Sequence, residues 1–423
     1  MFLMLIALLA LVTISVGAAP WPPAGRSVVQ FGAKGDGTAD DTAAVQTALD
    51  EAGQAGGGTV LLPAGNFNIA GHLSVPPGVT LKGTWQYVSS DTGKRWGGEG
   101  APKYGTILLV TENAGNEQGD PFITLTDHAT LQGVNVYYPN QKYDSAPDPY
   151  PWAVSMGGNN SAVIDVELLN PYKGISAVGA HRHLIRNVHG QPLRLGILVD
   201  QVYDIGRIEN VHWNPWWSNR SPVSDWQMQN AEGFVFGRTD WQYVLNTFCF
   251  GYKVGYRFDD LGKGVCNGNF LGIGADDSLV PVLVQNCAPF GLLITNGEFV
   301  SFHGDDPTMV VVEQSNSGSV RFNNCAYWGP CNQIAKIAGK GTVGFSDCTF
   351  VQWDAPKQGR HAIQAGGGTV LIRGCEFRQD APQISLEADV RKAIISENVV
   401  RGAVRIDNAA EGTVHVGVNL GDE

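Results

Sequence analysis

The sequence is poor in charged residues, in helical patterns and in long apolar runs. Its 28 Lys and Arg against 40 Asp and Glu give a formal net charge of −12. An acidic chain is a poor partner for nucleic acid or for an anionic membrane surface, so we expect neither. An anionic polysaccharide stays compatible, because a groove can carry a local charge of its own.

The cysteines do not have the pattern of a disulfide scaffold or of a zinc site. There are seven of them, an odd number, and no Cys-x-x-Cys pair or His cluster at zinc spacing occurs. We therefore expect no metal and no cofactor. Cys325, Cys348 and Cys375 recur at one position of a repeat, which favours packed thiols, although stacked neighbours would not be too far apart for a bridge.

Only one stretch is long and apolar, and it lies at the start. Met1 to Ala19 ends in Ser-Val-Gly-Ala-Ala and reads as a secretory signal peptide, although no Lys or Arg precedes Arg26. We expect the mature chain, residues 20–423, to form a single domain that is secreted or periplasmic, with no membrane partner after cleavage.

A repeat dominates the second half of the chain. Residues 318–327, 341–350 and 368–377 share the order apolar, any, apolar, two residues, Cys, any, apolar. The first part alternates with period two, which indicates a strand, and the two-residue break before Cys indicates a corner.

The corner position can be followed through most of the chain. Downstream it falls on Asn398 and Asn419, and upstream we place it on Gly297, Asn269, Phe248, Val211, Val188, Val166 and Val134. The shortest steps are about 22 residues, and a repeat of this size with insertions indicates a solenoid. Short β-rich runs predict an all-β fold, a single-stranded right-handed parallel β-helix of about 11 to 12 coils.

One amphipathic helix is predicted over residues 38–53. Ala44, Val45, Ala48, Leu49 and Ala52 form its apolar stripe. A solenoid exposes an open apolar end, which this helix would cap. We interpret Asp40 and Asp41 as helix-start residues rather than as a catalytic pair.

The N-terminal motifs resemble a known superfamily. Phe31-Gly32-Ala33-Lys34-Gly35-Asp36-Gly37, Asp40-Asp41-Thr42, Gly56-Gly57-Gly58-Thr59-Val60 and Leu62-Pro63-Ala64-Gly65 resemble the signature of the pectate-lyase-like superfamily, in its rhamnogalacturonase- and epimerase-like branch. The resemblance implies a secreted β-helix. It does not specify the chemistry, because members include glycosidases, lyases and transferases.

Insertions a few residues past the corner predict a binding face along one side of the solenoid. The expected loops are Pro139 to Trp152, Asn214 to Gln227, Gly274 to Pro281, His303 to Pro307 and Trp353 to Arg360. They and their neighbours are rich in aromatic rings, which stack on sugars, and in carboxylates, which accept hydroxyl hydrogen bonds. We expect a polysaccharide or oligosaccharide to bind Trp213, Trp216, Trp217, Trp226, Trp328, Trp353, His212 and His303, with Arg257 and Lys263.

Four carboxylates in two of these loops are the catalytic candidates: Asp276, Asp277, Asp305 and Asp306. Asp277 and Asp305 have the same offset from Asn269 and Gly297, so on adjacent coils they would lie about 5 to 9 Å apart, the range that glycoside hydrolysis uses. Like charges in a partly dry groove would raise one pKa and supply the acid.

Asp276-Asp277 followed one coil later by His303-Gly304 also resembles two elements of the polygalacturonase family. That family's Asn-Thr-Asp segment has no match, since Phe258-Asp259-Asp260 occupies the region, and its Arg-Ile-Lys motif has no counterpart.

Three functions stay open at the level of sequence. The first is a glycoside hydrolase with paired Asp carboxylates. The second is a calcium-dependent lyase acting on a uronate polymer, with Asp259, Asp260, Asp276 and Asp277 as ligands and Lys263 or Arg257 as base. The third is a non-catalytic glycan-binding surface protein. An epimerase or transglycosylase is also compatible. His181, His183, His189 and His212 are either a ring around the substrate or polar turn residues.

Overall fold

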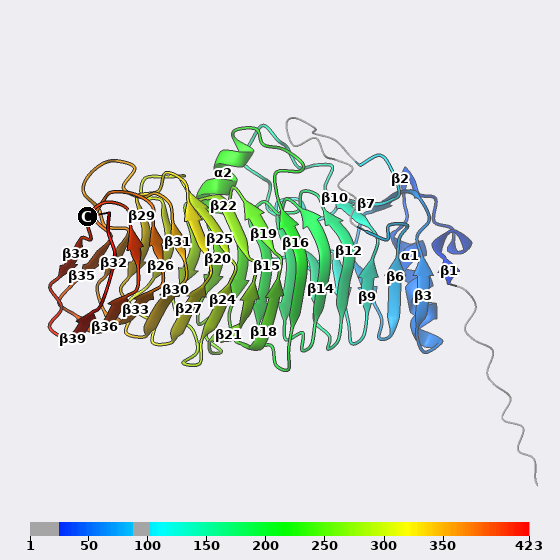
Figure 1. The fold of residues 1–423 in the computed structure, drawn as a ribbon. Coiled ribbons are helices and arrows are strands. Elements are labelled where there is room, and N and C mark those ends of the chain that lie inside the picture. The colour runs from blue at the N-terminus through cyan, green and yellow to red at the C-terminus, as the bar shows by residue number, and fades with distance from the viewer. Residues whose placement is uncertain (1–24, 88–101, 423) are drawn as a thin grey trace, which may run out of the picture.

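The computed structural model describes residues 25–87 and 102–422, and in them the chain winds into a right-handed parallel β-helix (Figure 1). Each coil contributes a strand before a corner, a strand after it and a third strand across the core. The described residues hold 13 strands in the third series, so there are more coils than the 11 to 12 predicted. The predicted signal peptide lies outside the described residues.

The third series forms one sheet, called sheet B here. Its strands, one per coil, are β5 (Leu73–Val75), β8 (Ile123–Leu125), β11 (Trp152–Met156), β13 (Lys173–Val178), β15 (Leu195–Asp200), β17 (Glu232–Phe236), β20 (Val254–Phe258), β23 (Val280–Val284), β26 (Thr308–Val312), β29 (Gln333–Ile337), β32 (Ile363–Ala365), β35 (Ile384–Leu386) and β38 (Ile406–Asn408).

The strands before the corner are β1 (Arg26–Ser27), β3 (Gly58–Leu61), β6 (Val79–Lys82), β9 (Thr130–Gln132), β18 (Thr239–Leu245), β21 (Cys266–Leu271), β24 (Leu292–Thr295), β27 (Ser319–Asn323), β30 (Thr342–Ser346), β33 (Gly368–Arg373), β36 (Val390–Ser396) and β39 (Thr413–Val416). Those after it are β2 (Asp36–Asp40), β4 (Gly65–Ile69), β7 (Thr106–Val110), β10 (Asn135–Tyr137), β19 (Phe248–Phe250), β22 (Gly274–Ser278), β25 (Glu298–Ser301), β28 (Ala326–Trp328), β31 (Thr349–Phe350), β34 (Glu376–Phe377) and β37 (Val399–Val400). Three strands pass through the corner unbroken: β12 (Ala162–Leu168), β14 (Leu184–Gly190) and β16 (Arg207–Trp213).

The corner is made by one residue in the left-handed conformation. Asn296, Asn324 and Asp347 have φ of 55°, 52° and 55°, and the corner residue follows each of them. Asn and Asp tolerate this conformation better than other side chains, since their short polar groups bond locally. The repeat predicted from the sequence is therefore confirmed at these coils.

Two upstream corner positions were placed wrongly. The left-handed residues of these coils are Asn246 and Gly272, so the corners are Thr247 and Ile273 rather than Phe248 and Asn269. The strand register agrees, since Phe248 pairs with Gly274.

The predicted ladder of corner residues is present. Cys325, Cys348 and Cys375 are 1–2% exposed, and Asn398 Oδ1 accepts a 2.9 Å hydrogen bond from the Cys375 backbone N–H. Asn398 Nδ2 then donates to Asn419 Oδ1 at 2.8 Å. All seven cysteines are free and buried, which confirms the prediction of packed thiols.

Helices α1 (Thr42–Gln54) and η1 (Val28–Phe31) close the N-terminal end of the solenoid (Figure 1). The α1 helix starts four residues later than predicted, because Thr38 to Asp40 belong to β2. Asp41 lies at the N-cap of α1 as predicted, but its carboxylate does not cap the helix; it accepts hydrogen bonds from the backbone N–H groups of Lys34 and Gly35 at 2.6 and 3.1 Å. Asp40 Oδ1 instead accepts a 3.0 Å hydrogen bond from the Thr42 N–H at the start of the helix.

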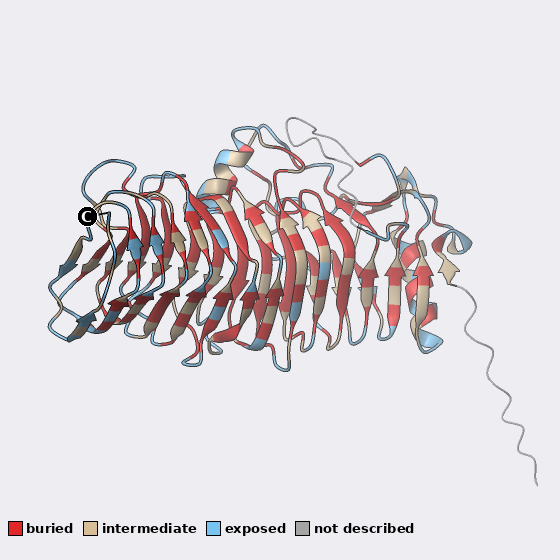
Figure 2. Ribbon diagram, viewed as in Figure 1, coloured by how far each residue is buried: buried red, intermediate tan, exposed pale blue. Residues whose placement is uncertain are grey.

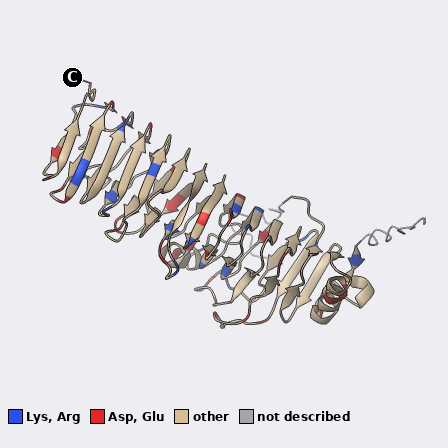
Figure 3. Ribbon diagram, turned by 90° about the horizontal axis from the view of Figure 1, so that it is seen from below, with Lys and Arg blue, Asp and Glu red and all other residues tan. Residues whose placement is uncertain are grey.

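The core consists of the inward residues of all three strand series, which Figure 2 shows as continuous buried bands. Aromatic rings of neighbouring coils stack inside it, as Phe234 does on Tyr256 with centroids 4.7 Å apart. Figure 3 shows that the strands carry few charges. Such a core fixes the coil spacing, and with it the spacing of the outward residues.

The insertions predicted past the corner lie along one edge of the solenoid, between the strands after the corner and sheet B (Figure 1). One of them contains a helix that the sequence did not predict, α2 (Val223–Asn230). Another was wrongly predicted as a loop, because Gly274 to Ser278 form strand β22.

Candidate active site

A groove with a volume of about 400 Å³ crosses four neighbouring strands after the corner: β19, β22, β25 and β28. Its lining residues are Asn246, Thr247, Phe248, Gly272, Ile273, Gly274, Ala275, Asp276, Asn296, Glu298, Val300 and Trp328. Every second side chain of these strands points into the core, as those of Ala275 and Phe299 do. The side chains that alternate with them therefore face the groove.

Two carboxylates face this groove from adjacent coils. Glu298 of β25 is the register partner of Gly274, and Asp276 stands two residues further along β22. Parallel strands about 4.8 Å apart with a rise of about 3.3 Å per residue place the two α-carbons about 8 Å apart. Carboxyl groups that hydrolyse glycosidic bonds with inversion are separated by about 6.5–9.5 Å, and side chains that leave the backbone at this α-carbon spacing can present their carboxyl groups in that range.

An aromatic side chain stands beside the pair. Trp328 follows on β28, is 41% exposed, and donates a hydrogen bond from Nε1 to Glu298 Oε1 at 2.9 Å. The bond fixes the direction of the Glu298 carboxylate and leaves a face of the indole to the groove. A flat apolar ring next to two carboxylates is suited to binding a sugar, because the ring can stack on the sugar and the carboxylates can accept hydrogen bonds from its hydroxyl groups.

Asp277, the residue after Asp276, turns away to form a dyad with His303. The Asp277 backbone has φ of 52° at a register shift between β22 and β25, which re-aims its side chain. Asp277 Oδ1 and His303 Nδ1 are 2.5 Å apart. Burial raises the pKa of the Asp277 carboxyl, and the neighbouring His303 opposes part of that rise.

The dyad lies between two cavities that flank helix α2. Asp277 lines a cavity of about 280 Å³ with Phe250 and Gln227, and His303 lines one of about 360 Å³ with Asp305 and Asp225. Met228 of α2 lines both. The helix therefore stands over the dyad, beside the groove.

Asp277 and Asp305 do not have the equal offsets from the corner that the sequence predicts. The corner of the first coil is Ile273, so the offsets of the two residues are four and eight. The structure instead pairs Asp277 with His303. Asp305 is exposed on the loop before β26.

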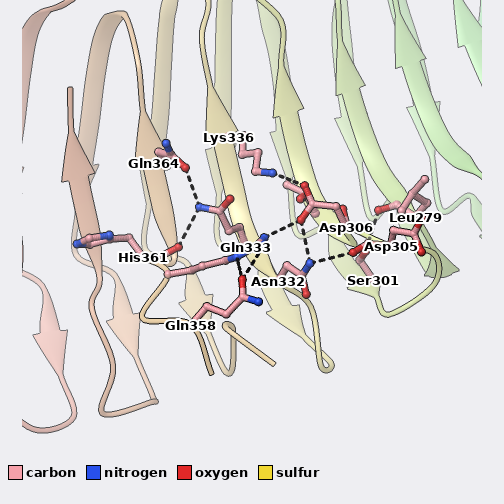
Figure 4. A network of polar contacts seen from close by, with 12 residues as sticks. Leu279, Ser301, Asp305, Asp306, Asn332, Gln333, Lys336, Gln358, His361 and Gln364 are labelled. Carbon is pink, nitrogen blue, oxygen red and sulfur yellow. Dashed lines mark hydrogen bonds and ion pairs between the residues drawn. The ribbon is translucent and has the colours of Figure 1, made fainter. Parts of the chain in front are cut away.

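Asp306 is held in a network of structural contacts (Figure 4). Its carboxylate contacts Lys336 Nζ and accepts hydrogen bonds from Asn332 Nδ2 at 2.8 Å and Arg360 Nη1 at 2.7 Å. Partial burial opposes its ionisation, but hydrogen bonds from these three partners outweigh the burial and hold its pKa at about 2. A carboxyl of this kind stays ionised and anchors loops.

The tryptophans predicted to bind substrate occupy different environments. Trp213, Trp217 and Trp353 are at most 2% exposed and belong to apolar clusters, so they pack rather than bind. Trp226 packs on Tyr172, with ring centroids 5.9 Å apart. Trp216 covers two histidines, and only Trp328 lines the groove.

The four upstream histidines do not form a ring. His189 and His212 are register partners on β14 and β16, with ring centroids 5.6 Å apart. His181 and His183 lie before β14, where the buried His183 bonds the Ala180 carbonyl at 2.9 Å. Burial lowers the pKa of both His183 and His189 to about 4, so both are neutral at pH 7.

The residues predicted for a calcium-dependent lyase are not together. Asp259 and Asp260 follow the end of β20, whereas Asp276 and Asp277 precede β23, its neighbour in sheet B. The five residues of such a strand separate the two pairs by about 17 Å. Arg257 binds Glu232 at 3.1 Å, and Lys263 is exposed beyond Asp260. In residues 25–87 and 102–422, no three His, Cys, Asp or Glu side chains are grouped to hold a metal ion.

Sequence reasoning missed Glu298. The signal was present, because Glu298 directly follows the corner residue Gly297 and alternates with the buried Phe299. With the corner placed correctly at Ile273, listing the outward residue of each coil puts Glu298 beside Gly274.

The N-terminal part of the chain matches a known family model. Residues 25–101 match the model described as rhamnogalacturonase A/epimerase, pectate lyase-like. The resemblance to the pectate-lyase-like superfamily is confirmed. The match ends well before the groove, so it bears on the fold and not on Asp276 or Glu298.

Curated relatives share only a short segment with this chain. Mannuronan C5-epimerase AlgE1 of Azotobacter vinelandii is 46% identical over 69 residues, and alginate lyase 7 of the same organism is 58% identical over 45 residues. These segments are 16% and 11% of this chain, and the chain spans about 5% of the length of each relative.

A solved structure shows the same fold over nearly the whole chain. The catalytic unit of the GH87 α-1,3-glucanase from Streptomyces thermodiastaticus strain HF3-3 superposes with a TM-score of 0.55 and 13% identity. The superposition covers 96% of this chain and 70% of the glucanase unit.

No described helix is long and apolar enough to cross a membrane.

Proposed function

We propose that the protein is a secreted carbohydrate-active enzyme, a glycoside hydrolase that cleaves a polysaccharide or oligosaccharide in the groove across β19, β22, β25 and β28. The observation that carries the proposal is that Asp276 and Glu298 line one groove from adjacent coils, beside Trp328, with an α-carbon spacing from which two carboxyl groups can reach one glycosidic bond. The names of the epimerase, lyase and glucanase relatives are consistent with a glycan substrate.

The chemistry needs one carboxyl group as acid and one as base. One of Asp276 and Glu298 protonates the glycosidic oxygen while the C–O bond to the anomeric carbon breaks. The other accepts a proton from a water molecule, whose oxygen bonds the same carbon from the opposite face. The Asp277–His303 dyad acts as a positioning pair, because its hydrogen bond fixes the bulge that turns Asp276 into the groove.

The test is a panel of polysaccharides that includes mannuronan, polygalacturonate and α-1,3-glucan. Reducing ends and the ultraviolet absorbance of unsaturated uronate are measured together, with and without a chelator. Wild type is compared with Asp276→Asn and Glu298→Gln. Each substitution removes an acid–base group, so we expect rates to fall by about 10²- to 10⁴-fold.

Glu376→Gln is the matched control. Glu376 occupies the same outward register as Glu298, three coils downstream and outside the groove. Its substitution should leave the rate unchanged. Full activity in Asp276→Asn and Glu298→Gln would overturn the proposed site. Unsaturated products that vanish with chelator would favour the lyase, and no cleavage of any polymer would favour the binding protein.

A further inference from the structure

The outward face of the strands after the corner is covered on one side of the groove. Four rings gather over β14 and β16, and we name them the aromatic plug: Tyr87, His189, His212 and Trp216. Trp216 lies parallel to His189, with an interplanar angle of 18° and centroids 6.4 Å apart, and meets His212 edge-on at 5.2 Å. Tyr87 meets His189 edge-on at 6.2 Å.

The plug is anchored to the body of the protein. Gln191, which is fully buried, accepts hydrogen bonds through Oε1 from the backbone N–H groups of Trp217 and Ser218 at 3.0 and 2.9 Å. Trp216 also packs against an apolar cluster that includes Leu169, Leu193 and Trp217. On the other side, the Tyr87 hydroxyl accepts a 3.3 Å hydrogen bond from Asn210 Nδ2. Such contacts hold the rings in place over the strands.

The plug adjoins the groove directly. His212 and Phe248 are register partners, and their rings meet edge-on with centroids 5.1 Å apart. Phe248 is in turn the first outward strand residue of the groove lining. The groove therefore starts where the plug ends.

Exposure along the same register differs between the two sides of the groove. Glu167, the partner of His189 on β12, is fully buried, and His189 and His212 are half-buried. Downstream of the groove, Glu376 and its partner Val399 on the next coil are exposed. Figure 2 shows the same increase in exposure toward the C-terminal coils. The groove is closed on its N-terminal side and open on the other.

We infer that the plug makes the enzyme act on the end of a glycan chain rather than at internal bonds, an inference that rests on the proposed hydrolase. Asp276 lies on β22, two strands from β16, which leaves about 10 Å between the plug strand and the strand that carries the carboxylate. This space holds a mono- or disaccharide. The remainder of the polymer extends over β28 and β31, short of Glu376 on β34, and each cleavage releases a short product of one size.

The experiment follows product size and viscosity on the polymer of the panel that is cleaved fastest. Wild type should release one short product while the viscosity changes little. Trp216→Ala and Tyr87→Ala, separately and together, should open the closed side and give a ladder of oligosaccharides. At equal numbers of reducing ends, we expect the double variant to lower the viscosity about tenfold more than wild type does.

Trp241→Ala is the control, since Trp241 is 59% exposed on β18, on the other side of the corner. It should keep the wild-type product pattern. Thermal unfolding checks that the variants fold, and Tyr87, which is itself 56% exposed, gives a variant that leaves the Trp216 packing intact.

The outcomes separate the two proposals. Internal cleavage by wild type overturns the plug but leaves the hydrolase standing. Cleavage at chain ends that survives removal of both rings overturns the assignment of the plug. No cleavage of any polymer overturns the hydrolase and the plug's role with it.

Discussion

His303 Nδ1 and Asp277 Oδ1 lie 2.5 Å apart, and this contact joins two coils at the place where β22 and β25 fall out of register. The Asp277 side chain is 12% exposed and that of His303 34%. A mostly buried carboxyl thus has its main partner in a half-exposed imidazole, which gives stability a dependence on pH.

Replacing His303 by Gln should destabilise the fold more at pH 7 than at pH 4. Burial raises the folded-state pKa of Asp277 above its unfolded value, and His303 limits that rise. Without the imidazole the pKa rises further. The added cost is absent below the unfolded pKa, where Asp277 is protonated in both states, and appears as pH rises through the folded pKa. We expect about 1 kcal/mol at pH 7. Thermal unfolding of both proteins from pH 4 to 7 measures it, and a penalty that shrinks as pH rises would contradict the argument.

Replacing Trp328 by Phe separates binding from orientation. Phe keeps a ring in the groove but cannot donate the 2.9 Å hydrogen bond to Glu298. We expect kcat to fall about tenfold with KM nearly unchanged, since an oriented carboxylate matters in the transition state. Trp328→Ala should also raise KM. Steady-state kinetics on one oligosaccharide distinguishes the two effects, and equal kcat values for wild type and Trp328→Phe would refute the orienting role.

Asp306→Asn should cost stability and leave catalysis intact. The Asp306 side chain is 48% exposed, so its ion pairs are screened and we expect at most about 1 kcal/mol. Its pKa is held at about 2, so the stabilisation is complete above the unfolded pKa and is lost as pH falls through about 2. The difference in unfolding free energy between the two proteins should therefore narrow from pH 5 downward. A large loss of kcat in Asp306→Asn would show that Asp306 takes part in catalysis, as predicted from the sequence.

Replacing Asp41 by Ala should destabilise the N-terminal cap. The carboxylate is buried and binds the backbone N–H groups of Lys34 and Gly35, which would lose their partner. Charge-assisted bonds of this kind contribute about 1.5–3 kcal/mol each at most. Denaturant unfolding measures the loss. Asp40→Asn changes the neighbouring carboxylate, which is exposed, and should lower the unfolding free energy by less. A lower kcat in a fully folded Asp41→Ala variant would instead indicate a catalytic role for Asp41.

Thiol titration should find no reactive cysteine in the native protein and seven after denaturation, with or without prior reduction. Burial raises the pKa of Cys266, Cys287 and Cys331 to about 12, which suppresses the reactive thiolate. Fewer than seven thiols in the unreduced, denatured protein would reveal a disulfide bond.

The candidate site could be predicted only in part. Asp276 and Asp277 stood out as a pair after a strand, and the structure places Asp276 in the groove. The partner of each was missed, because the pairing depends on which residues of adjacent coils share a register. The repeat is fixed by its Cys residues only in the downstream coils, and upstream of them Asn269 is predicted as a corner that the structure places at Ile273.

The sequence by itself determined the solenoid. From Cys325 to Asn398, each coil repeats a period-two pattern, a residue in the left-handed conformation and a small buried side chain at the corner, and these are local signals that one coil carries alone. The capping helix is local in the same way. The tertiary structure decided everything that faces outward: which Trp is buried, that Glu298 stands beside Asp276, that His303 holds Asp277, and that rings close one end of the groove. The outward positions show no repeating pattern in the sequence, because they do not pack in the core. Their neighbours in space belong to other coils, and loops of unequal length make the sequence separation between neighbours differ from coil to coil. Only the stacked coils bring them together.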